Sequence, residues 1–298
     1  MNNSIDDYHD LTLTFAEPPQ RVISLVPSLT ESLFDLGFGN TVVGITDYCI
    51  HPSEKLIGCV RIGGTKDPRV RDIITLQPDL VIANQEENSP ETIYELENAG
   101  IKVWLTFPKT VRQAVDNLWV MVGIFQNKMA ALRLEVLERS LDWVISASSE
   151  RTKKIRYFCP IWQDEEEMGN PKWMTFNRNT YMDNLLDIFG GENIFKDREK
   201  WDSDDSDEGE NKRYPINRDR RYPQVTREEI ISGDPDLIIL PDEPFLFGET
   251  HQEIFYQIFS RCSAAKQRKI LLVDGSLITW YGTRLARSLE ILPSIFNQ

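Results

Sequence analysis

Two side chains that can attack a carbon atom or bind a metal stand close together in the first half of the sequence. Cys49 and His51 are separated by one residue, a spacing open to a nucleophile with its base or to two ligands of one metal ion. A nucleophile also needs an orienting third group and an oxyanion donor, and a structural zinc site needs two further ligands at recognisable spacing. Because the sequence offers neither set, we expect both side chains to pack internally or to line a ligand-binding surface.

Other chemically versatile side chains fall just after short apolar runs. These segments cover residues 46–52, 84–88, 161–162, 173–175, 241–245 and 280–284. Their aromatic rings offer large contact surfaces, and their polar groups orient a bound molecule. The candidate ligand-binding residues from these segments are Tyr48, Cys49, His51, Asn84, Trp162, Trp173, Trp280, Tyr281 and Arg284.

Two alternatives stay open for these segments. Arg284 either binds an anionic ligand together with Trp280 and Tyr281, or it pairs with a nearby acidic side chain. An enzyme acting here would need a base and a nucleophile that converge within ~3 Å of one point. The residues available to it are Cys49, His51, Asp242, Glu243 and Arg284.

An internal repeat indicates which elements position these segments. Residues 72–82 read DIITLQPDLVI, and residues 229–239, which lie 157 positions later, read EIISGDPDLII. Each copy has apolar residues at helical spacing, a Pro-Asp pair that ends the helix, and a run typical of a buried parallel strand. The repeat predicts an α/β fold with a parallel sheet in each half, and ligands then bind at the carboxyl ends of the strands.

The two halves also begin alike. Residues 21–27 (RVISLVP) and 154–160 (KIRYFCP) each show a basic start, a β-rich run and a closing proline. In the first half we expect a helix to follow, with Ser28 and Glu31 as its capping box. Further strands are expected at residues 41–45, 81–83, 103–107, 238–240 and 270–273.

A long segment with few helix breakers separates the halves. Residues 110–149 carry apolar side chains at helical spacing, with a joint between two helices expected near Gly123 and Asn127. We therefore expect an N-terminal α/β lobe (1–109), a connecting backbone helix (110–150) and a C-terminal α/β lobe (151–298). A stiff connector permits small rocking motions and hinders wide hinge closure.

Composition disfavours several classes of partner. The 298 residues include 33 Lys and Arg against 47 Asp and Glu, a net charge of −14, which repels nucleic acid and anionic membrane surfaces. No run reaches the ~18 apolar residues of a membrane helix, and residues 1–15 lack a signal-peptide pattern. We expect the chain as it stands to be cytoplasmic, or periplasmic or lipid-anchored if a signal was removed.

Two smaller features also have structural interpretations. The four cysteines form no CxxC pair, so free thiols are favoured over a Cys49–Cys59 bridge. Residues 202–210 (DSDDSDEGE) are expected to form a solvated acidic loop, because the spacing lacks the glycine and final glutamate of an EF-hand calcium loop.

Six motifs in sequence order carry a family resemblance. They are RVISLVPSLTE (21–31), GITDYCIHP (44–52), RIGG (61–64), LQPDLVIA (76–83), GGENIFKD (190–197) and YPQVTREEI (222–230). Together they resemble the helical-backbone (class III) substrate-binding proteins of ABC importers, most closely the branch that binds cobalamin and related corrinoids, over residues 21–289. The resemblance implies two Rossmann-like lobes joined by a rigid helix. It also implies a non-catalytic monomer with no intrinsic cofactor, which holds a small metal chelate between its lobes.

The resemblance also assigns individual residues. Tyr48 matches an aromatic that faces the corrin ring, Tyr222 stands where a tryptophan is expected, and the Trp280–Tyr281 loop lines the cleft. Thr65 and Asn84 replace tryptophans, which implies a more polar cleft. The ligand is then cobalamin, another corrinoid, or a siderophore-like or haem-like chelate, whose metal His51 or Cys49 can approach as an axial ligand.

Permease docking departs from the family pattern in one half. The family presents one glutamate from each lobe to arginines of a permease, and Glu228 fits that place in the second lobe. In the first lobe Arg71 stands where the acid belongs, although the adjacent Asp72 can substitute. Because like charges in contact cost several kcal/mol, this favours a member that no longer docks. A conventional importer receptor for cobalamin or iron-siderophore is the alternative, and an enzyme acting in the same cleft is the third hypothesis.

Overall fold

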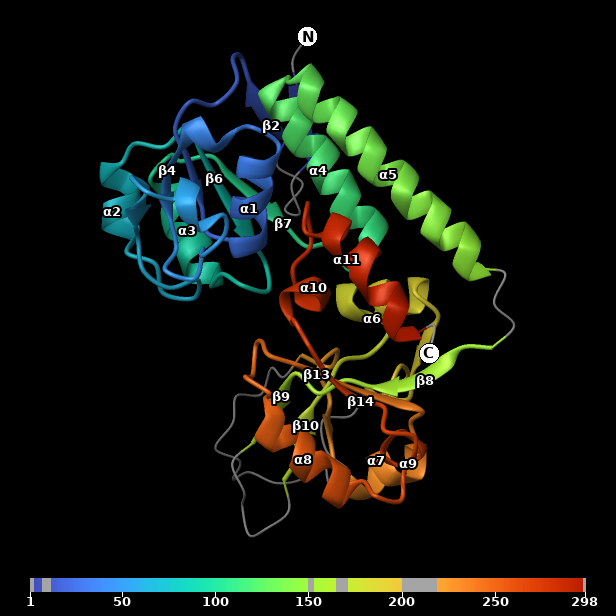
Figure 1. Ribbon diagram of the computed structural model, residues 1–298. Coiled ribbons are helices and arrows are strands. Elements are labelled where there is room, and N and C mark those ends of the chain that lie inside the picture. Colours follow the sequence, from blue (N-terminus) through green and yellow to red (C-terminus); the bar gives the residue numbers. More distant parts are fainter. Residues whose placement is uncertain (1–2, 7–11, 150–152, 165–170, 200–218, 297–298) are drawn as a thin grey trace. The chain divides into compact units, whose positions relative to one another are not determined.

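The computed structural model describes residues 3–6, 12–149, 153–164, 171–199 and 219–296, and its contacts divide the chain into two compact units (Figure 1). Unit 1 comprises residues 1–141 together with 280–286, and unit 2 comprises residues 142–279 together with 287–298. Residues 280–286, which we expected in a C-terminal lobe, therefore group with the first half of the chain. The acidic stretch 202–210 lies outside the described residues.

Unit 1 is built on a five-stranded parallel sheet with the order β5-β4-β3-β6-β7. Its strands are β3 (Val22–Ser24), β4 (Val42–Ile45), β5 (Val60–Arg61), β6 (Leu80–Asn84) and β7 (Val103–Thr106), and an antiparallel pair, β1 (Asn3–Asp6) and β2 (Thr12–Phe15), precedes them. Its helices are α1 (Pro27–Asp35), α2 (Val70–Thr75), α3 (Pro90–Asn98), α4 (Val111–Phe125) and the first part of α5 (Lys128–Ser149), with 3-10 turns at Gly39–Thr41 and Ser53–Lys55. One cluster of its buried side chains is wholly aliphatic and packs the sheet against its helices.

Unit 2 combines two sheets. A parallel sheet has the order β11-β8-β13-β14 and an antiparallel sheet the order β12-β10-β9. The strands are β8 (Ile155–Phe158), β9 (Trp162–Gln163), β10 (Trp173–Met174), β11 (Gly191–Asn193), β12 (Gln224–Val225), β13 (Leu237–Pro241) and β14 (Ile270–Val273). The helices are the last part of α5, then α6 (Tyr181–Ile188), α7 (Arg227–Gly233), α8 (Glu249–Ile258), α9 (Ser263–Lys266), α10 (Ser276–Thr279) and α11 (Leu285–Ile291), with a final 3-10 turn at Leu292–Phe296. The first two residues of α11 group with unit 1.

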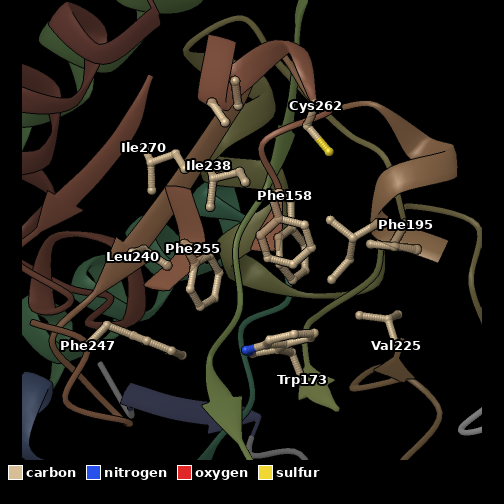
Figure 2. Close-up of a cluster of buried hydrophobic side chains, with 14 residues drawn as sticks. Phe158, Trp173, Phe195, Val225, Ile238, Leu240, Phe247, Phe255, Cys262 and Ile270 are labelled. Atoms are coloured by element: carbon tan, nitrogen blue, oxygen red, sulfur yellow. The ribbon is translucent and has the colours of Figure 1, made fainter. Parts of the chain in front are cut away.

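The core of unit 2 is rich in aromatic rings. Phe158, Phe195, Phe247 and Phe255 gather around the fully buried Trp173, as Figure 2 shows. The Trp173 ring meets Phe255 edge-on with centroids 5.5 Å apart, a favoured aromatic geometry. These rings pack the parallel sheet and the antiparallel sheet into one hydrophobic cluster.

The internal repeat of the sequence is also a repeat of backbone geometry. Helices α2 and α7 are each followed by a residue in the left-handed region, Gln77 with φ 47° and Asp234 with φ 40°. In unit 1 the Arg21 guanidinium donates hydrogen bonds to the carbonyls of Leu76 and Gln77. Arg156 does the same for the carbonyls of Gly233 and Asp234 in unit 2. The helix–proline–strand unit thus ends its helix with the same backbone conformation and the same arginine contact in both halves. The expected α/β class with parallel sheets is confirmed.

The paired strands correct one detail of that repeat. Val22 pairs with Leu80 in unit 1, and Tyr157 pairs with Leu237 in unit 2. The equivalent of Arg21 is therefore Arg156, two residues later than the pairing of 21–27 with 154–160 that the sequence suggested. The difference arises because sheet register depends on cross-strand hydrogen bonds, whereas the sequence comparison relied on the flanking prolines.

The expected capping box at Ser28 is wrong. Helix α1 begins with Pro27 after Val26, and no side chain caps it. Proline suits the first helical position because its fixed φ matches the helix and no N–H is left unpaired. A capping box is present instead at α7, where Thr226 and Glu229 satisfy each other's backbone N–H groups.

The segment 110–149 forms two helices, as the sequence predicted. Helix α4 ends at Phe125, and the Asn127 side chain then accepts hydrogen bonds from the N–H groups of Met129 and Ala130 at the start of α5. Arg112 of α4 pairs with Glu138 of α5 at 3.0 Å, and the two helices run side by side (Figure 1). No helix within the described residues combines the length and the hydropathy that a membrane crossing requires.

Candidate ligand-binding site

The loop after β4 is held by an arginine from β5. The Arg61 guanidinium donates to the carbonyl oxygens of Thr46 at 2.7 Å and Cys49 at 2.8 Å. The turn that carries Tyr48 is thereby fixed to the sheet, and the Tyr48 side chain itself is 63% exposed. Arg61 had no assigned role in the sequence analysis, although the motif RIGG contains it.

The Cys49 thiol points into unit 1. It is fully buried, and its Sγ lies 3.1 Å from Thr30 Oγ1 and 3.2 Å from Thr46 Oγ1. Burial raises the pKa of this thiol, because the thiolate loses its hydration. Such a cysteine is a poor nucleophile and a poor metal ligand, since both roles need the thiolate. All four cysteines are free, as the sequence analysis favoured.

His51 lies beside a tryptophan from the far end of the sequence. Its ring centroid is 5.7 Å from that of Trp280, and the planes meet at 66°, an edge-to-face contact. Both side chains are half-buried. Both residues were expected to bind the ligand, and unit 1 brings them into contact.

Arg284 contacts the Trp280 ring and completes this group of side chains. Its guanidinium carbon lies 5.0 Å from the centre of the Trp280 ring. The Nε and Nη2 groups donate to Glu31 at 2.8 and 2.6 Å, so the pair is bidentate. Of the two alternatives for Arg284, the structure shows the pairing with an acid.

A buried polar network connects the neighbouring loops of unit 1. Asn88 accepts a hydrogen bond from the Asn84 N–H and donates to the Thr65 carbonyl. The Asn84 amide in turn donates to the Thr106 carbonyl at 3.0 Å, and Thr106 Oγ1 lies 3.5 Å from the Tyr281 hydroxyl. Thr65, Asn84 and Tyr281 are thus linked through two residues, Asn88 and Thr106, that the sequence analysis did not assign.

Tyr281 is buried at one end of that network. Burial raises the pKa of its hydroxyl well above the usual value, and the nearby negative charge of Glu87 adds to the shift. A neutral phenol here is a hydrogen-bond donor and is protected from ionisation at any physiological pH. Tyr281 is thus connected to Asn84 through the Thr106 side chain.

Unit 2 has its own group of aromatic side chains at the carboxyl ends of its strands. Trp162 is 45% exposed and meets Phe245 with ring centroids 5.6 Å apart, and the adjacent Leu246 is 72% exposed. Asp242 accepts from the Gly275 N–H, and Glu243 accepts from the Thr279 hydroxyl at 2.9 Å. These two acids tie the loop after β13 to the loop after β14.

Two other predicted residues of unit 2 lie elsewhere in the fold. Trp173 is fully buried in the core, with its indole N–H donated to Gln163 Oε1 at 2.9 Å. Tyr222 is half-buried, with the guanidinium carbon of Arg221 5.4 Å from its ring centre. A buried ring offers no surface to a ligand, so we leave Trp173 out of the site proposed below.

The docking candidates occupy equivalent positions of the repeat. Arg71 and Asp72 lie on α2, and Glu228 lies on α7, 157 residues after Arg71. Arg71 and Glu228 are exposed, whereas Asp72 is bound by the Arg69 guanidinium at 2.6 Å. The search of the described residues finds no group of three or more His, Cys, Asp or Glu side chains that could hold a metal ion.

Comparison with known proteins places this arrangement in a family. A family model described as periplasmic binding protein matches residues 22–274. The chain belongs to that family. An uncharacterized ABC transporter substrate-binding lipoprotein of Bacillus subtilis is 26% identical over 99% of this chain and 87% of its own length. A vitamin B12-binding protein of Vibrio cholerae is 23% identical over 78% of this chain and 74% of its own length.

Solved structures of the family share the fold. The periplasmic vitamin B12 binding protein of Vibrio cholerae has a TM-score of 0.73 at 20% identity, covering 94% of this chain and 97% of that one. A periplasmic heme-binding protein from Roseiflexus has a TM-score of 0.70 at 20% identity, covering 93% of this chain and 97% of the other. These likenesses confirm the fold that the sequence motifs implied.

Proposed function

We propose that this protein is a non-catalytic receptor for a metal chelate with a flat macrocycle, such as a corrinoid or a haem-like compound. The observation that carries the proposal is the contact between His51 and Trp280, with the exposed Tyr48 ring on the loop that also carries His51. Aromatic rings contact a flat macrocycle over a large area, and an imidazole reaches its metal. Relatives named for vitamin B12 and heme support the same class of ligand.

His51 is the metal-facing side chain in this proposal, and Cys49 is not. The neutral imidazole is a ligand that cobalt and iron accept, and His51 is half-buried. The Cys49 thiol is fully buried against Thr30 and Thr46, with a raised pKa. A metal at Cys49 would have to displace both of those contacts.

Three of the candidate catalytic groups, Arg284, Asp242 and Glu243, are engaged in structural contacts, and the Cys49 thiol is buried, which favours binding over catalysis. The Arg284 guanidinium is paired with Glu31, so its charge is neutralised inside unit 1. Asp242 and Glu243 fasten loops of unit 2. A general base needs its proton-accepting atoms directed at a substrate, and these acids direct them at protein donors.

Titration with defined chelates tests the proposal. Hydroxocobalamin and ferric protoporphyrin IX each carry a metal whose axial ligand exchanges, so binding through His51 shifts the visible spectrum. We expect at least one of them to bind with Kd on the order of 1 μM or tighter by calorimetry, with such a shift. His51→Ala should remove the shift and keep part of the heat, because the aromatic contacts remain.

A histidine of unit 2 provides the matched control. The His251 ring packs edge-on against both Phe245 and Phe247, and its Nδ1 accepts from the Gly248 N–H. His251→Asn keeps an acceptor for that N–H and should leave both heat and spectrum unchanged. If neither chelate produces heat or a spectral change, the proposed ligand class is wrong. If His51→Ala binds with the wild-type spectrum, His51 is not the metal-facing residue.

The protein partner in this proposal is an ABC permease. The two positions considered for docking carry opposite charges. Glu228 on α7 suits a basic partner residue, whereas Arg71 at the equivalent position of α2 repels one. On an ABC permease complex of the host in lipid nanodiscs, Arg71→Glu should strengthen binding and Glu228→Lys should weaken it. Weaker binding after Arg71→Glu would show that the α2 position meets an acidic partner surface.

A further inference from the structure

We propose that Arg284, held by Glu31, is a positioning residue that fixes the Trp280 indole beside His51. The ring pair is then a preformed part of unit 1, although Trp280 stands 229 positions after His51 in the sequence. This inference rests on the proposed function, because it concerns how the ligand-contact rings are held. It assigns roles to Glu31 and Arg284 that differ from contact with the ligand.

The chain of contacts begins at helix α1. Glu31 projects from that helix, and both its oxygens accept from the Arg284 fork at 2.6 and 2.8 Å. The side chains are only 13% and 2% exposed, respectively. Because a bidentate carboxylate–guanidinium pair fixes the plane as well as the position of the guanidinium, Arg284 has little freedom to turn.

The fixed guanidinium then restrains the indole. Its carbon lies 5.0 Å from the Trp280 ring centre, within the range of a cation–π attraction, which strengthens when water is excluded. The indole in turn meets the His51 imidazole edge-to-face. The carboxylate of Glu31 therefore orients the ring pair through two intervening contacts, without itself lying next to His51.

The backbone around these residues is also fastened to α1. Gly282 has φ +101°, a conformation that L side chains rarely adopt, and a Cβ there would collide with the Ser32 hydroxyl. The next residue, Thr283, donates its N–H to Ser32 Oγ at 3.1 Å and its hydroxyl to Asp35 at 2.8 Å. The segment carrying Trp280 is thus held by Ser32 through the Thr283 backbone, by Asp35 through the Thr283 hydroxyl, and by Arg284 through the indole.

A double-mutant cycle separates positioning through Trp280 from general stabilisation. The variants are Arg284→Lys, Trp280→Phe and both together. Lysine keeps the positive charge opposite Glu31 but lacks the planar fork that stacks on the indole. We expect Arg284→Lys to weaken binding of hydroxocobalamin or ferric protoporphyrin IX by about three- to tenfold, the range of a lost cation–π restraint. In the Trp280→Phe background the same change should have no further effect.

A readout without ligand keeps the inference separate from the proposed function. The ring current of Trp280 shifts the NMR resonance of the His51 Cε1 proton, so displacement of the indole moves that resonance. We expect Arg284→Lys to move it toward its position in Trp280→Phe. If neither chelate binds, the proposed function is wrong. The His51 resonance still shows in that case whether Arg284 positions the Trp280 indole.

Two further variants keep the outcome interpretable. Arg112→Lys alters a partly exposed ion pair with Glu138 and should change neither binding nor the His51 resonance. If Arg284→Lys does not fold, Glu31→Asp replaces it, since a shorter acid draws the guanidinium away from the indole. Additive losses in the double mutant, or an unchanged His51 resonance in the folded single variants, would overturn the inference.

Discussion

The two units place different side chains on the same kind of sheet. The core cluster of unit 1 consists of isoleucine, leucine, valine and alanine, as on β6 (Val81, Ala83) and β7 (Val103, Leu105). The cluster of unit 2 contains phenylalanine from β8 and α8 and tryptophan from β10 (Figure 2). The helix–proline–strand repeat nevertheless closes alike in both, with Arg21 or Arg156 on the helix carbonyls. The two copies of the repeat therefore share the hydrogen bonds from an arginine side chain to the helix carbonyls, and not the shape of the core side chains.

The tryptophan in the unit 2 cluster has a hydrogen-bonding requirement that the aliphatic cluster of unit 1 does not have. Aliphatic side chains fill a core without polar atoms, whereas an indole carries an N–H that needs an acceptor when buried. Trp173 finds it in Gln163, a residue of the neighbouring strand β9. The antiparallel sheet of unit 2 thus contributes a polar contact to the core. We therefore expect a few large side chains to dominate the stability that the unit 2 cluster provides. In the unit 1 cluster we expect that stability to be spread over many smaller side chains.

The largest expected effect is the loss of the Trp173 side chain. Trp173→Ala should lower the free energy of unfolding of unit 2 by about 3–5 kcal/mol, because it leaves a large cavity among the phenylalanines. Amide hydrogen exchange followed by mass spectrometry checks this, since the faster exchange should be confined to unit 2 peptides. Equal acceleration in β3 and β6 of unit 1 would show that the two cores do not unfold as separate units.

The next effect isolates the indole N–H. Gln163→Ala removes its acceptor at 2.9 Å and should cost about 1–3 kcal/mol, the penalty of an unsatisfied buried donor. In a Trp173→Phe background the same change should cost much less, because phenylalanine has no N–H. Urea unfolding of the four proteins gives the coupling. If Gln163→Ala costs as much with phenylalanine as with tryptophan, the glutamine acts through packing.

The repeat and the strands could be predicted from the sequence because their signals are local. Ile270–Val273 was expected as a strand and is β14, and the Pro-Asp pairs end both helices as expected. The segment that carries Trp280 groups with unit 1, where Arg284 meets Glu31, 253 positions away. No local pattern encodes such a pair, which forms only when the sheet has already brought the segments together.

Other parts of the site escaped prediction for the same reason. Cys49 and His51 are near neighbours in sequence, yet the thiol is fully buried and the imidazole is half-exposed. The turn held by Arg61 separates them, and that contact depends on the pairing of β5 with β4. Asn88 and Thr106 were missed because their role is to satisfy buried groups of other loops.

A smaller effect concerns pH, and it distinguishes the buried polar networks of the units. The Tyr281 network of unit 1 uses amides and hydroxyls, whereas unit 2 buries Asp183, which accepts from Tyr157 and Asn193. Burial raises the pKa of the Asp183 carboxyl. The native state then holds this proton more tightly than the unfolded chain does. Its contribution to stability is present below the unfolded pKa of about 3.9 and is lost as pH rises through the folded value.

The substitution Asp183→Asn tests the direction in which Asp183 makes stability change with pH. The amide keeps an acceptor for Tyr157 and Asn193 and cannot ionise, so the variant should gain stability relative to wild type as pH rises from 4 toward 7. Thermal unfolding across that range measures the difference between the two proteins. A difference that is constant with pH would show that Asp183 has the same pKa in the folded and unfolded states.

The smallest effect compares the two left-handed residues of the repeat. Glycine adopts this conformation without the strain that a side chain adds, although it also makes the unfolded chain more flexible. Gln77→Gly should therefore stabilise unit 1 by about 0.5–1 kcal/mol. Asp234→Gly should not stabilise unit 2, because the Asp234 carboxylate accepts from the Ser263 N–H at 2.7 Å and the Ser263 hydroxyl at 3.0 Å. The urea midpoints of the two variants measure these changes in stability. Equal gains in stability would mean that backbone strain alone governs both positions. Equal losses would mean that the Gln77 side chain makes a contact as stabilising as that of Asp234.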